Sequence, residues 1–175
     1  MSPQEAGSQN PKADNRPNRI RGGKFLSFYL GGEEYGIEIL KVQEIMGLLP
    51  ITRVPQTIRY LKGVINLRGK VIPVIDLRMK FGMPAVESTN ETCIVVVHIH
   101  TVEVGVIVDK VSEVISIPDQ NIEPAPSFGA ECNTEYILGI GKTQERVIIL
   151  LNIDLVLPTN ELFQSEDSGQ GKLAG

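Results

Sequence analysis

The sequence predicts a mainly β protein in which two small β-barrels pack together. Short apolar runs rich in β-branched residues recur along the 175 residues, and Gly and Pro separate them, as is typical of small barrels and sandwiches. A block of the chain is repeated, which indicates two copies of one structural unit. A unit of this size is marginal alone, so we expect an apolar core shared between the barrels.

The repeat is the strongest indication of two barrels. EYGIEILKVQEI at 34–45 is echoed by EVGVIVDKVSEV at 103–114. Further on, YLKGVINLRGKVIPVIDL at 60–77 is echoed by YILGIGKTQERVIILLNIDL at 136–155. The matches include Gly, Lys, Glu and Tyr, which a coincidence between apolar runs would not produce. The two echoes keep the same order and define a unit of about 65 residues.

The expected strands form hairpins and short apolar runs. FLSFYLGGEEYGIEI at 25–39 predicts a hairpin that turns at its double glycine. TCIVVVHIHTVEVGVIVDKV at 92–111 predicts a second hairpin, which turns near residues 100–103. VIPVIDL at 71–77 and RVIILLNI at 146–153 have the length and the β-branched composition of single strands.

Only three short segments favour a helix. Residues 57–61 predict one or two turns, and a second helix is expected to start at an Asp76 N-cap and end at Gly82. A third is expected to start at Thr159. The repeat aligns Asp76 with Asp154, and we expect both to cap turns rather than to form a catalytic dyad.

The stretch GVINLRGKVIPVIDLR at 63–78 predicts a hairpin with a charged tip. Gly69 permits a positive φ in the turn, and its neighbour Arg68 is projected outward. Pro73 cannot donate to a ladder, so its position is expected at an edge or a bulge. Two readings stay open: the tip is a docking surface for a partner, or Arg68 is solvated and Pro73 only blocks aggregation.

We divide the chain into a tail at 1–22, a folded region at 23–158 and a second tail at 159–175. Within the folded region the first barrel is placed at 23–85 and the second at 86–158, with strand exchange between them left open. The first tail has more bases than acids, which fits a solvated tail or a weak electrostatic tether. No apolar run approaches about 18 residues, so no direct membrane insertion is expected.

The chain offers little for catalysis, and we expect no enzyme: the common nucleotide-binding, hydrolase and zinc-protease motifs are absent. Lys and Arg total 17 against 21 Asp and Glu, a net charge of −4, so nucleic acid is not an expected partner.

Cys93 and Cys132 lie far apart, which fits a reducing cytoplasm. His98 and His100 would bind a metal only if a third ligand such as Glu103 converged; an exposed strand face is the alternative.

Several of these segments resemble the CheW family of chemotaxis coupling proteins. The resemblance is carried by VQEI at 42–45, NLRG followed by PVIDLR, GVIVDKVSEVI, IEPAP and NTEYILGIG, in family order. It covers the chain from about Phe25 to Leu157 and leaves only the tails outside. The chain is thereby identified as a member of the family.

The resemblance implies two SH3-like five-stranded β-barrels around a common core, with short helices and no cofactor. It implies a non-enzymatic scaffold in the cytoplasm, held at the inner face of the membrane through receptor arrays. Such a scaffold couples the cytoplasmic tips of transmembrane chemoreceptors to the regulatory domain of the histidine kinase CheA, within a two-component signal-transduction system.

The resemblance also implies two binding surfaces. The receptor-binding residues would be Val42, Glu44, Gly63 and Arg68. Of these, Arg68 would pair with an acidic receptor group or hold the hairpin tip in place, Glu44 would orient the receptor helix, Val42 would supply apolar area and Gly63 close approach.

The ring contact with the kinase would be made by Ser127 and Phe128. A loop phenylalanine either plugs its own barrel or anchors a partner. Here the chain departs from the pattern of enteric members of the family: Glu123 stands in place of a basic residue and Ser127 in place of an acid. A kinase partner would then need compensating charges.

Three alternatives to a flagellar coupling protein remain. The same fold could serve a surface-motility or other receptor–kinase array. An adaptor of the CheV type would need a receiver domain, for which the sequence has no room. A metal- or ligand-binding barrel would centre on His98 and His100.

Overall fold

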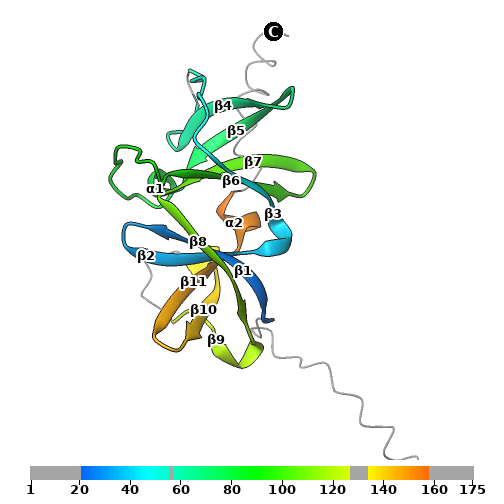
Figure 1. The fold of residues 1–175 in the computed structure, drawn as a ribbon, viewed down its shortest axis with the longest axis vertical. Helices are drawn as coiled ribbons and strands as arrows, with labels where there is room; N and C mark the ends of the chain where they lie inside the picture. Colours follow the sequence, from blue (N-terminus) through cyan, green and yellow to red (C-terminus); the bar gives the residue numbers. More distant parts are fainter. Residues whose placement is uncertain (1–20, 56, 127–133, 158–175) are drawn as a thin grey trace, which may run out of the picture.

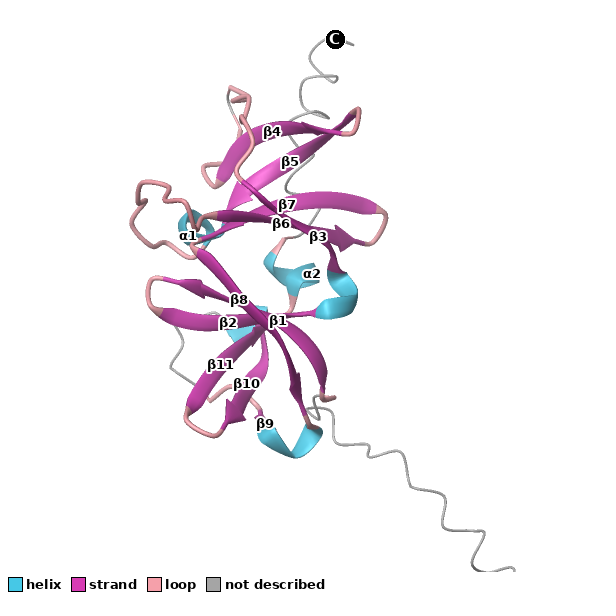
Figure 2. Ribbon diagram, viewed as in Figure 1, coloured by secondary structure: helices cyan, strands magenta, loops and turns pink. Residues whose placement is uncertain are grey.

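The computed structural model describes residues 21–55, 57–126 and 134–157, and strands dominate it (Figures 1 and 2). One sheet contains β1 (Gly23–Leu30), β2 (Glu33–Glu38), β8 (Lys110–Ile117), β9 (Ile122–Glu123), β10 (Ile137–Thr143) and β11 (Arg146–Leu151). The other contains β3 (Val42–Gly47), β4 (Leu61–Leu67), β5 (Lys70–Asp76), β6 (Cys93–Ile99) and β7 (Val102–Val108). The predicted mainly β fold is confirmed.

Both sheets curl so that their two edge strands follow one another in the chain. The first has the order β8-β1-β2-β11-β10-β9, and we call it the six-stranded barrel. The second has the order β3-β6-β7-β5-β4, and we call it the five-stranded barrel. Its closure is completed by a bridge between Thr52, which follows β3, and Val64 on β4. Figure 1 shows the five-stranded barrel above the six-stranded one, with α2 (Ile153–Val156) between them.

The two sequence copies exchange their first hairpins. The β1–β2 hairpin of the first copy joins the sheet of β8 to β11, where β2 runs parallel to β11. The β6–β7 hairpin of the second copy joins the sheet of β3 to β5, where β7 runs parallel to β5. The sheets therefore do not divide the chain at residues 85 and 86. The reason is that equivalent strands have the same apolar pattern, so each hairpin fits the sheet of either copy.

A glycine shared by the two copies lies at each parallel junction. Gly36 on β2 pairs with Leu150, and Gly105 on β7 pairs with Val74. A Cβ atom at Gly36 would lie 2.9 Å from Leu150 Cδ2, and one at Gly105 would lie 2.9 Å from Ile94 Cγ2. Since real Cβ contacts are longer, only glycine lets the barrel interior pack this closely.

The largest core lies between the barrels, as predicted. It contains 17 buried apolar residues drawn from both sheets, including Phe28, Val97 and Leu157. Each barrel interior adds a cluster of five: Phe25, Ile117, Ile122, Ile148 and Leu150 in one, and Ile65, Ile72, Val74, Ile94 and Val96 in the other. Neither barrel interior is large enough to be a stable core alone, so the interface between barrels stabilises both.

The helices are shorter than the sequence predicts. α1 (Leu77–Lys80) begins after the Asp76 cap, whose side chain accepts a hydrogen bond from Met79 N at 3.3 Å. Residues 57–61 form a turn rather than a helix, while Thr159 lies outside the described residues. α2 replaces the end of a predicted strand. The described part of the chain also contains three single 3₁₀ turns: η2 (Ile39–Lys41), η3 (Asp119–Asn121) and η4 (Thr134–Tyr136).

The structure also corrects the repeat alignment at its end. Asp76 N donates to Tyr60 O at 2.8 Å, and Asn152 N donates to Tyr136 O at 2.8 Å. Asn152 therefore occupies the place of Asp76, and Asp154 lies two residues later. There Asp154 pairs with Lys41 Nζ at 2.9 Å and joins α2 to the end of η2.

Candidate functional site

The β4–β5 hairpin ends in a two-residue turn in which both central residues have positive φ. Arg68 has φ +53° and Gly69 has φ +83°, a combination that matches the twist of a tight hairpin. The side chain of Asn66 accepts a hydrogen bond from Gly69 N at 2.9 Å and fixes the turn. The prediction for Gly69 is confirmed, and the same turn forces a non-glycine residue, Arg68, into the left-handed region.

Arg68 is held by Glu44 across the open end of the five-stranded barrel. Its two terminal nitrogens donate to the two carboxylate oxygens at 2.6 and 2.7 Å, in the bidentate geometry that favours arginine. These hydrogen bonds lower the pKa of Glu44, and they raise the pKa of Arg68. Glu44 lies on β3, at the opposite edge of the sheet from β4, so the pair links the two edges where the barrel closes.

Residues beside the pair extend it into a charged and apolar tip. Lys70 Nζ pairs with Glu103 on β7 at 3.0 Å. The side chains of Arg68 and Lys70 are 69% exposed, and Val71 next to them is also 69% exposed. The sequence pattern did not single out Lys70 or Val71. Their place beside the Arg68-Gly69 turn was the available signal.

The structure places the other two predicted receptor-binding residues differently. Val42 begins β3 and packs against the core between the barrels. Gly63 is buried at a β-bulge in β4 with φ +149°, where a Cβ atom would lie 2.1 Å from Thr52 O. The close approach that Gly63 makes is therefore to the chain's own backbone. Glu44 and Arg68 are in contact with each other, while Gly63 supports their hairpin from within.

Pro73 lies where no ladder hydrogen bond is needed. It faces Val64 on β4, whose N–H and C=O are both bonded to Thr52 at 2.8 and 2.9 Å. On the other side, β5 pairs with β7 only from Val74 onward. Pro73 thus precedes the doubly paired part of its strand, as a proline in a sheet requires.

Only part of the predicted kinase-contact surface lies within the described residues. Ser127 and Phe128 lie outside the described residues. Glu123, which precedes them on β9, pairs with Lys142 Nζ on β10 at 2.7 Å, and both side chains are largely exposed. The negative charge of Glu123 is thus partly balanced within the chain.

The histidine pair does not form a metal site among the described residues. His98 is exposed on β6, whereas His100 lies in the β6–β7 turn with φ +56°. Glu103, the third ligand considered, is engaged by Lys70. Across residues 21–55, 57–126 and 134–157 no three His, Cys, Asp or Glu side chains gather closely enough to hold a metal ion. Cys93 is half-buried against the core between the barrels.

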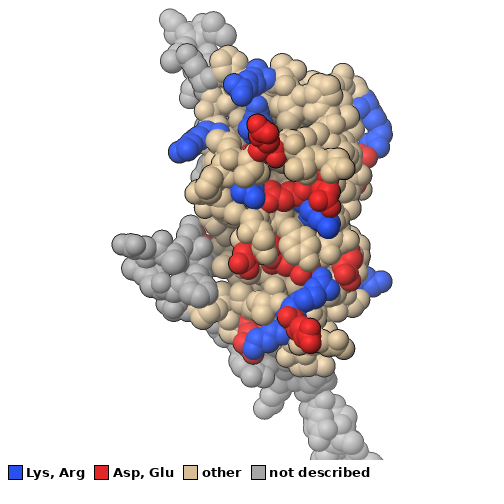
Figure 3. All heavy atoms as spheres, turned by 60° about the vertical axis from the view of Figure 1, so that its left-hand side comes forward, with Lys and Arg blue, Asp and Glu red and all other residues tan. Residues whose placement is uncertain are grey.

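Charges of both signs are mixed on the surface in view in Figure 3, where acidic and basic side chains lie next to one another. Two of the ion pairs above, Lys70–Glu103 and Lys142–Glu123, join neighbouring strands. None of the described helices is both long and apolar enough to cross a membrane.

Comparison with known proteins places this geometry in one family. The family model for the CheW-like domain matches residues 24–161. A chemotaxis protein CheW from Klebsiella aerogenes is 45% identical over 141 residues, covering 81% of this chain and 85% of the relative. One from Rhizobium meliloti is 34% identical, covering 80% and 90%. The solved scaffolding protein TtCheW from Thermoanaerobacter tengcongensis superposes with a TM-score of 0.73 at 37% identity, covering 80% of this chain and 95% of that one.

Proposed function

The chain belongs to the CheW-like family and is a coupling adaptor of chemotaxis, and from this premise we propose that it joins chemoreceptors to the histidine kinase CheA without catalysing a reaction. It acts in the cytoplasm, at the inner face of the membrane, because the receptors hold it there. Its role is to bind two proteins at once and fix their relative positions. Such coupling needs two separate surfaces on a rigid body, and the core between the barrels provides the rigidity.

The receptor-binding surface is centred on Glu44 and Arg68, with Val42 at the base of the same strand. The observation that carries this assignment is the bidentate Arg68–Glu44 pair at an exposed hairpin tip. A guanidinium has five N–H donors, and two nitrogens of Arg68 are used once each by Glu44. Donors remain for a carboxylate or carbonyl of a receptor helix, while Glu44 keeps the side chain oriented. The pair thus prepares Arg68 for docking at little further cost in side-chain entropy.

The kinase-binding surface is centred on Ser127 and Phe128, which follow β9 of the six-stranded barrel in the sequence. Glu123 precedes them and is paired with Lys142, so this region presents a balanced charge rather than a basic one. We expect the regulatory domain of the kinase to offer an aromatic-binding pocket for Phe128 and no strong acidic cluster opposite Glu123.

The assignment of the receptor surface is tested by co-sedimentation of the chain with receptor-containing membranes and CheA, with kinase activity measured in the same samples. Arg68→Glu and Glu44→Arg should each weaken receptor binding at least tenfold. The decisive variant is the double exchange Glu44→Arg with Arg68→Glu, which keeps an ion pair across the barrel end but inverts the charges that face the receptor. Binding should stay lost.

Restored binding in the double exchange would mean that the pair only supports the hairpin, and the receptor contact would be wrong. Lys142→Glu is the matched control, because it breaks an exposed ion pair at the other barrel. It should leave receptor binding unchanged and reduce association with CheA. Binding of neither protein by the native chain would overturn the proposed function as a whole.

A further inference from the structure

A hollow surface lies between the end of β3 and the start of β4, away from the Arg68 tip. One depression of about 340 Å³ is lined by Arg53, Val54, Thr57, Ile58, Arg59, Leu61, Lys62 and Met79. A second of about 250 Å³ is lined by Leu48, Leu49, Ile51, Arg53, Lys62, Ser88 and Ile107. Because Arg53 and Lys62 line both, the two form one continuous trough, which we call the basic groove.

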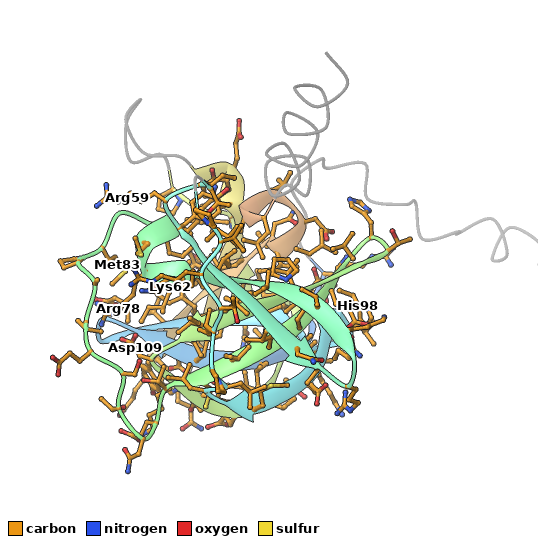
Figure 4. All side chains as sticks on the ribbon, turned by 90° about the horizontal axis from the view of Figure 1, so that it is seen from above. Arg59, Lys62, Arg78, Met83, His98 and Asp109 are labelled. Carbon is orange, nitrogen blue, oxygen red and sulfur yellow. The ribbon has the colours of Figure 1, made fainter. Side chains whose placement is uncertain are left out.

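Two of the three cations in the basic groove are unpaired among the described residues, and the third is weakly paired. Arg53 and Arg59 are exposed and make no ion pair or side-chain hydrogen bond with any part of the chain that the structure describes. Lys62 has only a long contact, 3.9 Å from its Nζ to Asp76 Oδ2. By contrast, the cations Arg68, Lys70, Arg78 and Arg146 are each paired at shorter distances. Figure 4 shows Arg59 and Lys62 on one flank of the molecule and His98 on the opposite flank.

The same groove exposes apolar side chains. Leu48, Leu49 and Val54 are each 36–38% exposed, which is unusual for three large aliphatic residues within one loop. A trough with unpaired cations and partly exposed aliphatic side chains fits a segment that carries both carboxylates and large apolar residues. A small inorganic phosphate would pair with the cations but would leave the aliphatic side chains uncovered.

The chain itself contains such a segment shortly after the last described residue. Residues 161–167 read ELFQSED, with the acids Glu161, Glu166 and Asp167 and the large apolar residues Leu162 and Phe163. Three carboxylates match the three cations of the groove, and two apolar side chains match its aliphatic wall. No other stretch of the sequence outside the described residues combines these features.

The last described residue, Leu157, is connected to the groove through a short chain of contacts. Tyr60, which lies between the groove residues Arg59 and Leu61, is covered by Lys80, whose Nζ is 4.4 Å from its ring centroid. Lys80 Nζ is also 5.4 Å from the ring of Tyr136, whose carbonyl accepts a hydrogen bond from Asn152 N at the start of α2. Leu157 at the end of α2 and Tyr60 belong to the same buried cluster. The ten residues from 158 to 167 span up to about 35 Å, which is ample for this distance.

We propose that the acidic segment 161–167 docks in the basic groove of its own molecule as a C-terminal strap. Glu161, Glu166 and Asp167 pair with Arg53, Arg59 and Lys62, and Leu162 and Phe163 cover Leu48, Leu49 and Val54. Neither Glu44 nor Arg68 lines the groove, so the strap leaves the receptor-binding surface open. The proposal does not depend on the proposed partners and stands if either of them is wrong.

Disulfide trapping in the full chain tests the strap directly. In a background in which Cys93 and Cys132 are replaced by serine, the pair Val54→Cys with Leu162→Cys should form an intramolecular disulfide under mild oxidation. The matched control is Val147→Cys with Leu162→Cys, since Val147 is an exposed valine on β11 of the other barrel. The Val54 pair should close at least tenfold faster than the control. Equal rates would overturn the proposal.

Charge exchange separates specific docking from chance contact. Arg53→Glu with Arg59→Glu should slow closure of the Val54 pair at least tenfold, and adding Glu161→Arg with Glu166→Arg should restore it. Disulfides that form between molecules and increase with protein concentration would place a second copy in the groove and overturn docking in the same chain. Trapping that is insensitive to both charge exchanges would also contradict it.

Discussion

The two barrels are built from equivalent strands, yet their open ends are closed in different ways. In the five-stranded barrel two cations close the end together, since Arg68 holds Glu44 and Lys70 holds Glu103. In the six-stranded barrel the equivalent carboxylates are Glu113 and Glu34, and Arg146 alone pairs with both. The place of Arg68 is taken there by the uncharged Gln144, and the place of Lys70 by Arg146.

This difference shows that the duplicated unit keeps its closure with an inward cation in one barrel and with exposed cations in the other. The Arg146 side chain is 35% exposed, and the Glu34 side chain is 7% exposed. Hydrogen bonding to Glu34 raises the pKa of Arg146. The cation of the six-stranded barrel is thus drawn inward, where it satisfies a buried carboxylate. In the five-stranded barrel the turn residue Arg68 is a second cation, and its side chain is 69% exposed, as the proposed receptor contact requires.

The largest effect on stability is expected inside the hairpin that carries Arg68. Gly63→Ala would place a Cβ atom 2.1 Å from Thr52 O in a backbone region that alanine avoids. We expect a loss of about 3 kcal/mol or more in the free energy of unfolding, because backbone and not a flexible side chain must move. Denaturant unfolding measures this loss. Gly47→Ala is the control, because no atom lies within 4 Å of its added Cβ. It should change the unfolding midpoint far less. Equal effects of the two variants would refute the backbone clash as the cause.

The second prediction sets the two closures against each other. Arg146→Met leaves the buried carboxylate of Glu34 without its partner, so we expect a loss of about 2 kcal/mol. Lys70→Met removes an ion pair whose lysine is 69% exposed and whose carboxylate, Glu103, is 14% exposed, so the loss should be smaller, about 1 kcal/mol. Thermal and denaturant unfolding of both variants would measure the difference. Equal losses of stability would mean that the deeper burial of Glu34 does not make its ion pair the more important one.

A third ion pair joins the barrels and makes stability depend on pH. Asp109, between β7 and β8, accepts hydrogen bonds from Arg78 Nε and Nη2 at 2.7 and 2.6 Å and from Gly31 N at 2.9 Å. Figure 4 shows Arg78 and Asp109 side by side. The hydrogen bonds from Arg78 are the main cause of the lowered pKa of Asp109, and the Gly31 N–H adds to it against the opposing effect of burial.

A carboxyl whose pKa is lower in the folded state than in the unfolded state stabilises the fold above its unfolded pKa of about 3.9. That stabilisation is lost as pH falls through the folded pKa. Asp109→Asn should therefore destabilise the chain by about 1 kcal/mol at pH 7 and flatten the fall in stability below pH of about 4. Unfolding curves between neutral and acidic pH check this. A fall as steep as in the native chain would assign the acid sensitivity to other carboxyls.

The sequence predicted the two copies, the shared core and the Arg68-Gly69 turn, because each depends on local pattern and spacing. It did not predict which hairpin joins which sheet, since equivalent strands in both copies carry the same apolar alternation. Glu44 and Arg68 were both selected through family resemblance. That they hold each other could not be predicted, because their contact depends on barrel closure bringing β3 to the β4–β5 tip. The basic groove was missed for the same reason.

The smallest effect on stability is expected when the tip is made like its counterpart. Arg68→Gln introduces the residue found at the equivalent turn of the six-stranded barrel and removes the hydrogen bonds that lower the pKa of Glu44. The pKa of Glu44, followed by NMR of its carboxyl carbon, should rise towards its usual value, while the unfolding midpoint hardly changes. Receptor binding should still fall at least tenfold, because the receptor loses its proposed contact with the Arg68 guanidinium. Unchanged binding together with a risen Glu44 pKa would remove Arg68 from the docking surface and leave it a role only within the hairpin.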